Sequence, residues 1–169
     1  GRAGVTHARG GGVRAVARGG EGLRPLEDGR TGFVPRTAPG DRVRLRTLRL
    51  HKRFARAEIG EILAHGAGRV TPPCPHYVRD RCGSCQLMHL SADAQREAKG
   101  RIAGGALPRI GHLEIAAPVV IPSPAQLCYR ATGPFAVACG RAGAPPPAST
   151  RRVRAHPDAP PAARAGRDA

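Results

Sequence analysis

Hydrophobic and polar residues alternate in the first third of the chain. The stretch DRVRLRTLRL (41–50) places Val43 and Leu45 on one face and arginines on the other, because successive side chains of a strand point to opposite sides. One break in step falls at Thr47 and Leu48. The pattern predicts a strand over 41–50 with one buried face and one basic face.

Three neighbouring stretches predict further short strands. VRAVARGGEGL (13–23) favours a strand and a glycine turn, RTGFV (30–34) a strand entered through the turn signal EDG, and RFARAEIGEIL (53–63) a returning strand. The end of the last stretch also fits a helical period. Short strands joined by Gly and Pro turns predict a small OB-like β-barrel over residues 13–66. The Gly- and Arg-rich residues 1–12 are expected to form a flexible arm.

The pattern becomes helical after residue 90. Ser91 is a suitable N-cap, and apolar residues then recur every four positions. They predict a helix over 91–107 that ends at Pro108. HLEIAAPVVIPSP (112–124) predicts a strand in two pieces. From 132 to 169 the chain is mostly Ala, Pro, Arg and Gly without a period, so a disordered tail is expected. The fold class expected for the whole chain is mainly β.

Charge points to a polyanionic partner. The 169 residues include 28 Lys and Arg against 12 Asp and Glu, and only Lys52 and Lys99 are lysines. Arginine suits phosphate and stacks on bases, and nucleic acid is the commonest polyanion. A GC-rich genome would explain arginine over lysine but not the scarcity of acids. The alternative is a merely solvated outer face of the barrel. The candidate RNA-binding residues are Arg42, Arg44, Arg46, Arg49, Lys52 and Arg53.

Composition limits the other classes of function. Aromatic residues make up 3% of the chain, beside 23 Gly and 17 Pro, so the core is expected to be thin and to need a staple such as a metal. No apolar run approaches the ~20 residues of a membrane span, and no apolar signal-peptide core is present. We expect a cytoplasmic protein without a membrane partner.

Three cysteines form the strongest chemical signal. Cys74, Cys82 and Cys85 are spaced C-x7-C-x2-C among prolines that disfavour regular structure. A reducing cytosol favours metal binding over a disulfide. Three thiolates and a fourth ligand suit either zinc or an iron–sulfur cluster. His89 would complete a zinc site, and the other candidates for the fourth ligand are His76, Cys128 and Cys139.

These residues lie in a longer stretch that resembles a known family. RVTPPCPHYVRDRCGSCQLMHL (69–90) and PSPAQLCYR (122–130) resemble the iron–sulfur segment of the RNA uracil-C5 methyltransferases, the bacterial 23S ribosomal RNA enzymes that carry a TRAM domain. DGRTGFVPRTAPGDRV (28–43) resembles the TRAM domain itself. The resemblance covers about residues 13 to 131. Matching positions include Arg69, Val70, Pro72, Cys74, Cys82, Gly83, Cys85, Gln86, His89, Leu90, Lys99, Ser123, Pro124, Tyr129 and Arg130.

The resemblance implies an RNA-binding TRAM barrel and a [4Fe-4S] cluster in residues 67–131. Cys74, Cys82 and Cys85 would be three of its four ligands. Ser84 and Met88 replace a Gly and a Gln of the family pattern, and Cys128 stands where the family has Gly. The family's fourth cysteine lies further downstream. The fourth ligand therefore stays open between Cys139 and Cys128.

The family transfers a methyl group from S-adenosylmethionine with a C-terminal Rossmann-like domain. This chain has no glycine-rich loop between a strand and a helix. We therefore expect the N-terminal, RNA- and cluster-binding part of an rRNA uracil-C5 methyltransferase, truncated before its catalytic domain. It would have no catalytic residues, bind no S-adenosylmethionine and be inactive alone, with RNA and not DNA as partner. The alternative is a stand-alone zinc module for nucleic acid with His89 as a ligand.

Overall fold

The structure is a computed structural model that describes residues 3–4, 10–79, 81–116, 118–127, 136–138, 141–144 and 154–155. Of residues 3–4, 47–48 and those after 127, only the backbone is described. The chain divides into two compact units, Gly1–Thr71 with Gln86–Ile121, and Pro72–Cys85 with Pro122–Ala169. In this division residues 86–121, which include the long helix, group with the barrel.

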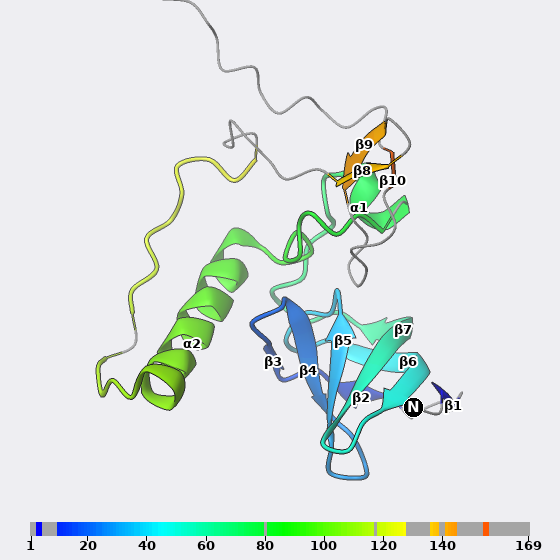
Figure 1. Cartoon of the computed structure of the whole chain (residues 1–169), viewed down its shortest axis with the longest axis horizontal. Coiled ribbons are helices and arrows are strands. Elements are labelled where there is room, and N and C mark those ends of the chain that lie inside the picture. The colour runs from blue at the N-terminus through cyan, green and yellow to red at the C-terminus, as the bar shows by residue number, and fades with distance from the viewer. Residues whose placement is uncertain are drawn as a thin grey trace, which may run out of the picture. The chain divides into compact units, whose positions relative to one another are not determined.

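The first unit is built on a curled antiparallel hairpin (Figure 1). Strands β6 (Arg42–Leu50) and β7 (Phe54–Ala64) pair along their length, β5 (Thr31–Pro35) runs parallel to β7, and β4 (Glu21–Pro25) pairs antiparallel with β5. The sheet order is β1-β6-β7-β5-β4-β3. The prediction of a mainly β fold with a small barrel is confirmed.

A short N-terminal segment closes this barrel. Strand β2 (Gly11–Gly12) pairs with β6, and β3 (Ala15–Val16) pairs with β4. Between them, the Val13 amide donates to the Asp41 carbonyl at 2.9 Å. The backbone thus passes from one edge of the sheet to the other. Strand β1 (Ala3–Gly4) also pairs with β6.

The expected flexible arm, residues 1–12, includes the paired strands β1 and β2. Each strand has only two residues, and three of the four are glycines without a side chain, so their backbone pairing leaves no hydrophobic pattern in the sequence. The rest of residues 1–9 lies outside the part of the chain that the structure describes.

Alternation along the strands fills the core as predicted. Val34, Val43 and Leu45 are fully buried. The possible helix at the end of the returning strand is not present, because β7 stays extended to Ala64. Val43 pairs with Ile62 and Leu45 with Ile59, so β7 has one extra residue at Gly60. This irregularity brings Ile59 and Ile62 onto the same face, which explains their helix-like spacing. The core residues are Val13, Val34, Val43, Leu45, Ala55 and Ala57.

Helix α2 (Ala92–Gly111) packs against the barrel through a second cluster, formed by Val16, Ala38, Leu90 and Ala98. The Ser91 hydroxyl accepts a hydrogen bond from the Ala94 amide at 3.2 Å, as an N-cap does. The predicted stop at Pro108 is wrong. Pro108 lies one turn before the end of the helix, where it removes one N–H bond and crowds one carbonyl of the preceding turn, and the helix continues to a left-handed cap at His112.

The segment after α2 also differs from its prediction. No strand occurs among the residues described between 112 and 127, although HLEIAAPVVIPSP predicts one. Most of its described apolar side chains are exposed, including Val119 and Ile121, and Val120 is half-buried. A strand needs a partner for its backbone, and these residues have none that the structure describes. No helix in the described ranges is both long and apolar enough to cross a membrane.

The second unit contains α1 (Pro75–Arg79) and a small sheet. Regular structure was not expected beside these prolines, but Pro75 occupies the first helical position, where an N–H is not needed. The sheet consists of β8 (Ala136–Ala138), β9 (Arg141–Ala144) and β10 (Arg154–Ala155). These three short strands are the part of the predicted tail, 132–169, that the structure describes. The remaining tail lies outside the described residues.

Candidate nucleic-acid interface and cysteine loop

Strand β6 presents its arginines to solvent. Arg42, Arg44 and Arg46 are exposed while Val43 and Leu45 between them are buried. Arg49, Lys52 and Arg53 are exposed at the end of β6 and in the turn to β7. All six residues singled out from the sequence therefore lie on one strand and its turn, where a polyanion can reach them.

Ion pairs divide these six cations into two groups. Arg44 pairs with Glu61, and Arg46 pairs with Glu58 at 2.8 Å, both across the β6–β7 hairpin. Such pairs partly neutralise the charge that a phosphate would meet. In the described part of the chain, no ion pair involves the other four, Arg42, Arg49, Lys52 and Arg53.

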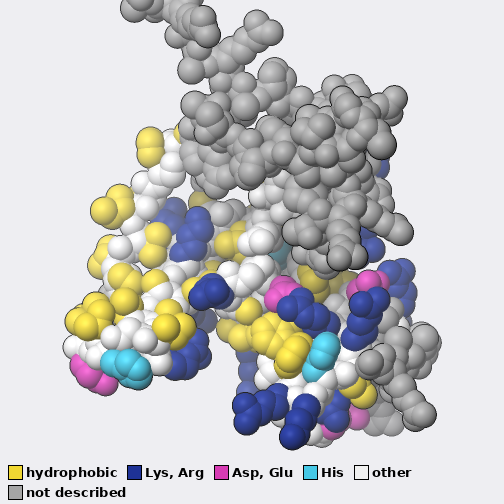
Figure 2. Space-filling view, in the orientation of Figure 1, with side chains coloured by type: hydrophobic (Ala, Val, Ile, Leu, Met, Phe, Trp, Pro, Cys, Tyr) yellow, Lys and Arg dark blue, Asp and Glu magenta, His cyan; other side chains and the backbone are white. Residues whose placement is uncertain are grey.

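Aromatic rings lie beside the turn. The His51 ring stacks on Phe54 with centroids 4.3 Å apart and planes 14° from parallel. Phe54 meets Phe33 edge to face at 5.7 Å. Figure 2 shows hydrophobic side chains gathered on the barrel with Lys and Arg side chains around them. No sequence signal marked these rings as a site, although Phe33 and Phe54 stand at polar-face positions of their strands.

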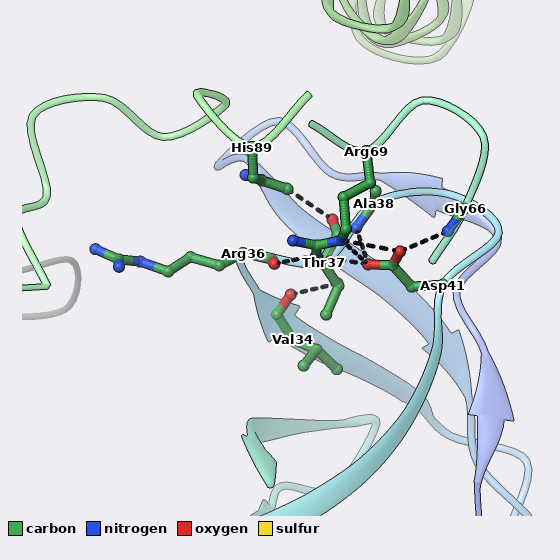
Figure 3. Close-up of polar contacts among 8 residues, drawn as sticks. All are labelled: Val34, Arg36, Thr37, Ala38, Asp41, Gly66, Arg69 and His89. Atoms are coloured by element: carbon green, nitrogen blue, oxygen red, sulfur yellow. Dashed lines mark hydrogen bonds and ion pairs between the residues drawn. The ribbon is translucent and has the colours of Figure 1, made fainter. Parts of the chain in front are cut away.

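Asp41 is the common hydrogen-bond acceptor for three segments at one end of the barrel (Figure 3). Its carboxylate is fully buried and accepts hydrogen bonds from the amides of Ala38 at 2.7 Å and Gly66 at 2.8 Å. Arg69 donates to it from Nη2 at 2.6 Å and from Nε at 3.0 Å. Arg69 also donates to the Arg36 carbonyl at 2.7 Å. This carbonyl is presented by a residue in the left-handed region, with φ 62°.

These donors stabilise the ionised form of the Asp41 carboxylate. Burial by itself would raise the pKa of the carboxyl, but hydrogen bonds from Arg69, Gly66 and Ala38 outweigh it and lower the pKa below its usual value. The Asp41–Arg69 pair therefore stays ionised in the folded protein. It ties the loop after β7 to the turn before β6.

His89 is part of the same assembly and not a free metal ligand. Its ring is 1% exposed, and Nε2 lies 3.1 Å from the Thr37 carbonyl. A carbonyl can only accept, so Nε2 carries the proton. Burial lowers the pKa of this imidazole. The hydrogen bond to the Thr37 carbonyl acts to raise the pKa, and the positive charge of Arg69 acts to lower it further. The structure gives His89 a packing role in place of the zinc-ligand role considered for it.

The cysteine loop is tied where it leaves and rejoins the first unit. Arg69 and Leu90 form an antiparallel bridge. The Val70 amide donates to the His89 carbonyl at 2.9 Å, and the Ser91 amide donates to the Gly68 carbonyl at 2.9 Å. We call these paired segments, residues 68–70 and 89–91, the neck. Residues 71–88 form a loop closed by the neck, and the loop contains three cysteines.

The three cysteines are placed differently within the second unit. Cys74 and Cys82 are half-buried, and Cys85 is exposed. The Cys74 carbonyl accepts from the Tyr77 amide, and the Cys82 amide donates to the His76 carbonyl, both at 3.1 Å. No three metal ligands lie close enough together among the described residues to hold an ion. Three thiols within one short closed loop nevertheless fit an iron–sulfur cluster by their chemistry.

The other candidates for the fourth ligand are two cysteines and His76. Cys128 and Cys139 lie outside the described residues. His76 is buried, and its Nδ1 lies 3.2 Å from Arg79 Nη2. This ring nitrogen therefore accepts from Arg79, an arrangement that engages it away from a metal.

Comparisons with known proteins identify relatives for the same region. No family model matches the chain. A 23S rRNA (uracil(1939)-C(5))-methyltransferase RlmD of Chromohalobacter salexigens is 37% identical over 134 residues, covering 79% of this chain and 27% of the relative. The enzyme of the same name from Halomonas elongata is 41% identical over 99 residues, covering 59% and 20%. An uncharacterized RNA methyltransferase of Protochlamydia amoebophila is 40% identical, covering 68% and 25%.

A solved structure has a similar fold. The tRNA (uracil-54, C5)-methyltransferase of Pyrococcus abyssi, in complex with S-adenosyl-L-homocysteine, matches with a TM-score of 0.55 and 23% identity. The match covers 89% of this chain and 32% of that enzyme. The resemblance to RNA uracil-C5 methyltransferases is thus confirmed, and the chain spans about a quarter of the length of the relatives it matches.

Proposed function

We propose that this chain is the RNA-recognition part of a cytoplasmic, S-adenosylmethionine-dependent RNA uracil-C5 methyltransferase that acts on ribosomal RNA. The observation that carries the proposal is the exposed basic strand β6 on a small barrel, in a chain similar to named 23S rRNA methyltransferases. Barrels of this kind bind single strands along a basic surface.

The cations of β6 would contact the phosphate backbone. Four of the six carry charge without an ion pair in the described residues, and three of these, Arg49, Lys52 and Arg53, lie together at the end of β6 and in its turn. Arg44 and Arg46 are paired with glutamates. The unpaired group can release counterions on binding without first breaking an ion pair. We therefore assign the larger share of RNA affinity to the end of β6 and its turn.

The test is the salt dependence of RNA affinity. The slope of log K against log salt is about −0.7 per phosphate neutralised on a single strand. Changing Arg49 and Arg53 together to Gln should lower the magnitude of that slope by about 1.4. Changing Arg44 and Arg46 to Gln is the matched control, with a smaller expected loss because these arginines are already paired. Equal slopes in the wild type and both variants would contradict the proposal.

The cysteine loop is proposed to hold a [4Fe-4S] cluster. Cys74, Cys82 and Cys85 would be three ligands, with Cys139 or Cys128 as the fourth. Bound there, the cluster would cross-link the loop and so have a structural role. A redox role is not required, because methyl transfer to uracil involves no electron transfer. The chain's own contribution is the neck, which brings the two ends of the loop together through backbone hydrogen bonds.

The cluster can be tested by metal content. Protein prepared without oxygen should contain about four irons per chain and absorb broadly near ~400 nm if four cysteines hold a cubane. Cys82→Ser should lose the iron. Comparison of Cys128→Ser with Cys139→Ser should identify the fourth ligand. One zinc per chain and no iron would favour the zinc module instead.

Methyl transfer is proposed to need parts of the relatives that the match does not cover. This chain alone should form no 5-methyluridine when incubated with S-adenosylmethionine and unmodified ribosomal RNA. The reason is that its described residues show no cofactor-binding loop between a strand and a helix. Turnover by this chain, measured by mass spectrometry of the digested RNA, would contradict the assignment.

A further inference from the structure

A row of apolar and aromatic side chains lies on the outer face of the barrel. Leu23 on β4 pairs with Phe33 on β5, and Phe54 pairs with Thr31 on the same strand. The strand neighbours of Phe33 and Phe54 are buried residues such as Val34 and Ala55. Since side chains alternate along a strand, the two phenylalanines point away from the core.

Packing within the barrel does not account for these rings. Phe33 and Phe54 are half-buried, and neither belongs to a hydrophobic cluster of the described residues. They contact each other edge to face at 5.7 Å. Aromatic rings pair with other flat rings in stacked or edge-to-face arrangements, so rings on an outer face can take a flat partner.

His51 extends the row into solvent. Its ring is exposed and lies parallel to Phe54 at 4.3 Å. The stack is continued by no other ring of the described residues. It therefore ends at a flat ring face beside the β6–β7 turn.

Cations lie directly beside this stack along the chain. Lys52 and Arg53 separate His51 from Phe54, and both are exposed. Flat rings next to cations are the combination that binds single-stranded nucleic acid, because rings stack on bases while cations hold phosphates. Paired bases stack on each other inside a duplex, so only an unpaired base can use such a surface.

We propose that His51, Phe54 and Phe33 form a stacking surface for an unpaired base of single-stranded RNA, with Lys52 and Arg53 binding the adjacent phosphates. The proposal rests on the proposed RNA-binding function and adds a base-binding site to it. The site takes any base, since every base has a flat face. It predicts that base contact and phosphate contact can be separated by mutation.

The test uses the full chain and a short single-stranded RNA that carries 2-aminopurine as a fluorescent stacking reporter. His51→Ala and Phe54→Leu should each weaken binding about five- to a hundredfold, the range for loss of one base–aromatic stack. They should also reduce the fluorescence quenching of the bound reporter and leave the salt slope unchanged. Leu63→Ala is the matched control, because Leu63 is a 40% exposed apolar residue near the other end of the same strand β7.

The outcomes separate this site from the RNA-binding function as a whole. RNA that binds the wild type, His51→Ala and Phe54→Leu with equal affinity and quenching would overturn the stacking surface and leave RNA binding standing. If the wild type binds no RNA at any salt concentration, both proposals fail. His51→Ala keeps the test decisive if Phe54→Leu destabilises the barrel, since His51 is exposed in a turn.

Discussion

Asp41 receives hydrogen bonds from three separate segments, namely the turn before β6, the loop after β7 and the neck. Its side chain is fully buried, and Arg69 is 11% exposed. A buried charge of this kind is stable only while its partner is present. The loss of one partner leaves the other uncompensated, and this sets the first prediction.

We expect Asp41→Asn to lower the free energy of unfolding by about 3–5 kcal/mol, because Arg69 stays buried without its counter-charge. The shift in the urea midpoint measures this change. Glu61→Gln is the control, since the exposed pair with Arg44 should contribute less than about 1 kcal/mol. Equal shifts for the two variants would contradict a structural role for the buried pair.

His89 predicts how stability depends on pH. The pKa of His89 in the folded protein lies below its value of about 6.5 in the unfolded chain. At a pH between the two pKa values, His89 is protonated in the unfolded chain and neutral in the folded protein. Stability should therefore be full above about pH 6.5 and decline as the pH falls toward the folded pKa. The charges that act on the ring are those of Arg69, Asp41 and Arg36. Asp41, with its lowered pKa, adds a loss only below about pH 4.

His89→Gln tests this directly. The variant should be less stable at pH 7.5 but should lose less stability than the wild type between pH 7.5 and 5.5. Urea midpoints at the two values give the comparison. A variant with the same pH dependence as the wild type would mean that His89 does not carry the effect.

Little of this residue-scale arrangement could be predicted. Arg69 and His89 were matched to a sequence pattern, but nothing in the sequence indicates that Asp41 is their common partner. The three residues are separated by long stretches, and only the closed barrel brings them together. His89 stands four positions after Cys85 and so resembles a metal ligand, which is why its packing role was missed.

Glycines allow close contacts between elements of the barrel. A Cβ atom on Gly66 would lie 2.0 Å from the Pro39 carbonyl oxygen, whereas one on Gly105 in α2 would meet nothing within 4 Å. Gly66 also donates its amide to Asp41. The backbone must therefore move if Gly66 gains a side chain.

We expect Gly66→Ala to destabilise the protein by at least the roughly 1–3 kcal/mol typical of overpacking. Gly105→Ala should stabilise it by up to about 1 kcal/mol, because alanine favours a helix interior. Thermal or urea unfolding of the two variants measures both. A neutral Gly66→Ala would show that the turn and the loop are not packed as closely as described.

At the scale of elements, the sequence predicted the strands and the helix whose hydrophobic and polar residues follow a regular period. β5, β6 and β7 follow from buried and exposed positions in turn, and α2 from its N-cap and apolar spacing. The two-residue strands β1 and β2, made of alanine and glycine, carry no such pattern and were missed. The stretch 112–124 has a strand-like pattern but no described pairing partner, which shows that pattern alone does not create a strand.

At the scale of the molecule, three cysteines and a basic barrel lie in one chain that matches a quarter of its relatives' length. The sequence led to the family because motifs on both sides of the cysteines match. It could not supply the fourth cluster ligand, because Cys128 and Cys139 stand in a stretch that departs from the family pattern. The structure adds the neck, which makes the cysteine segment a closed loop.

The most direct test of the central claim is to map where RNA touches the full chain. Ultraviolet crosslinking to a uridine-rich ribosomal RNA fragment, followed by mass spectrometry, identifies the bound residues. We expect crosslinks in the β6–β7 turn around His51 and Phe54, and their loss in the Arg49→Gln, Arg53→Gln variant. Crosslinks confined to the arginine-rich residues after Leu127, with none on the barrel, would contradict the claim that the barrel recognises RNA.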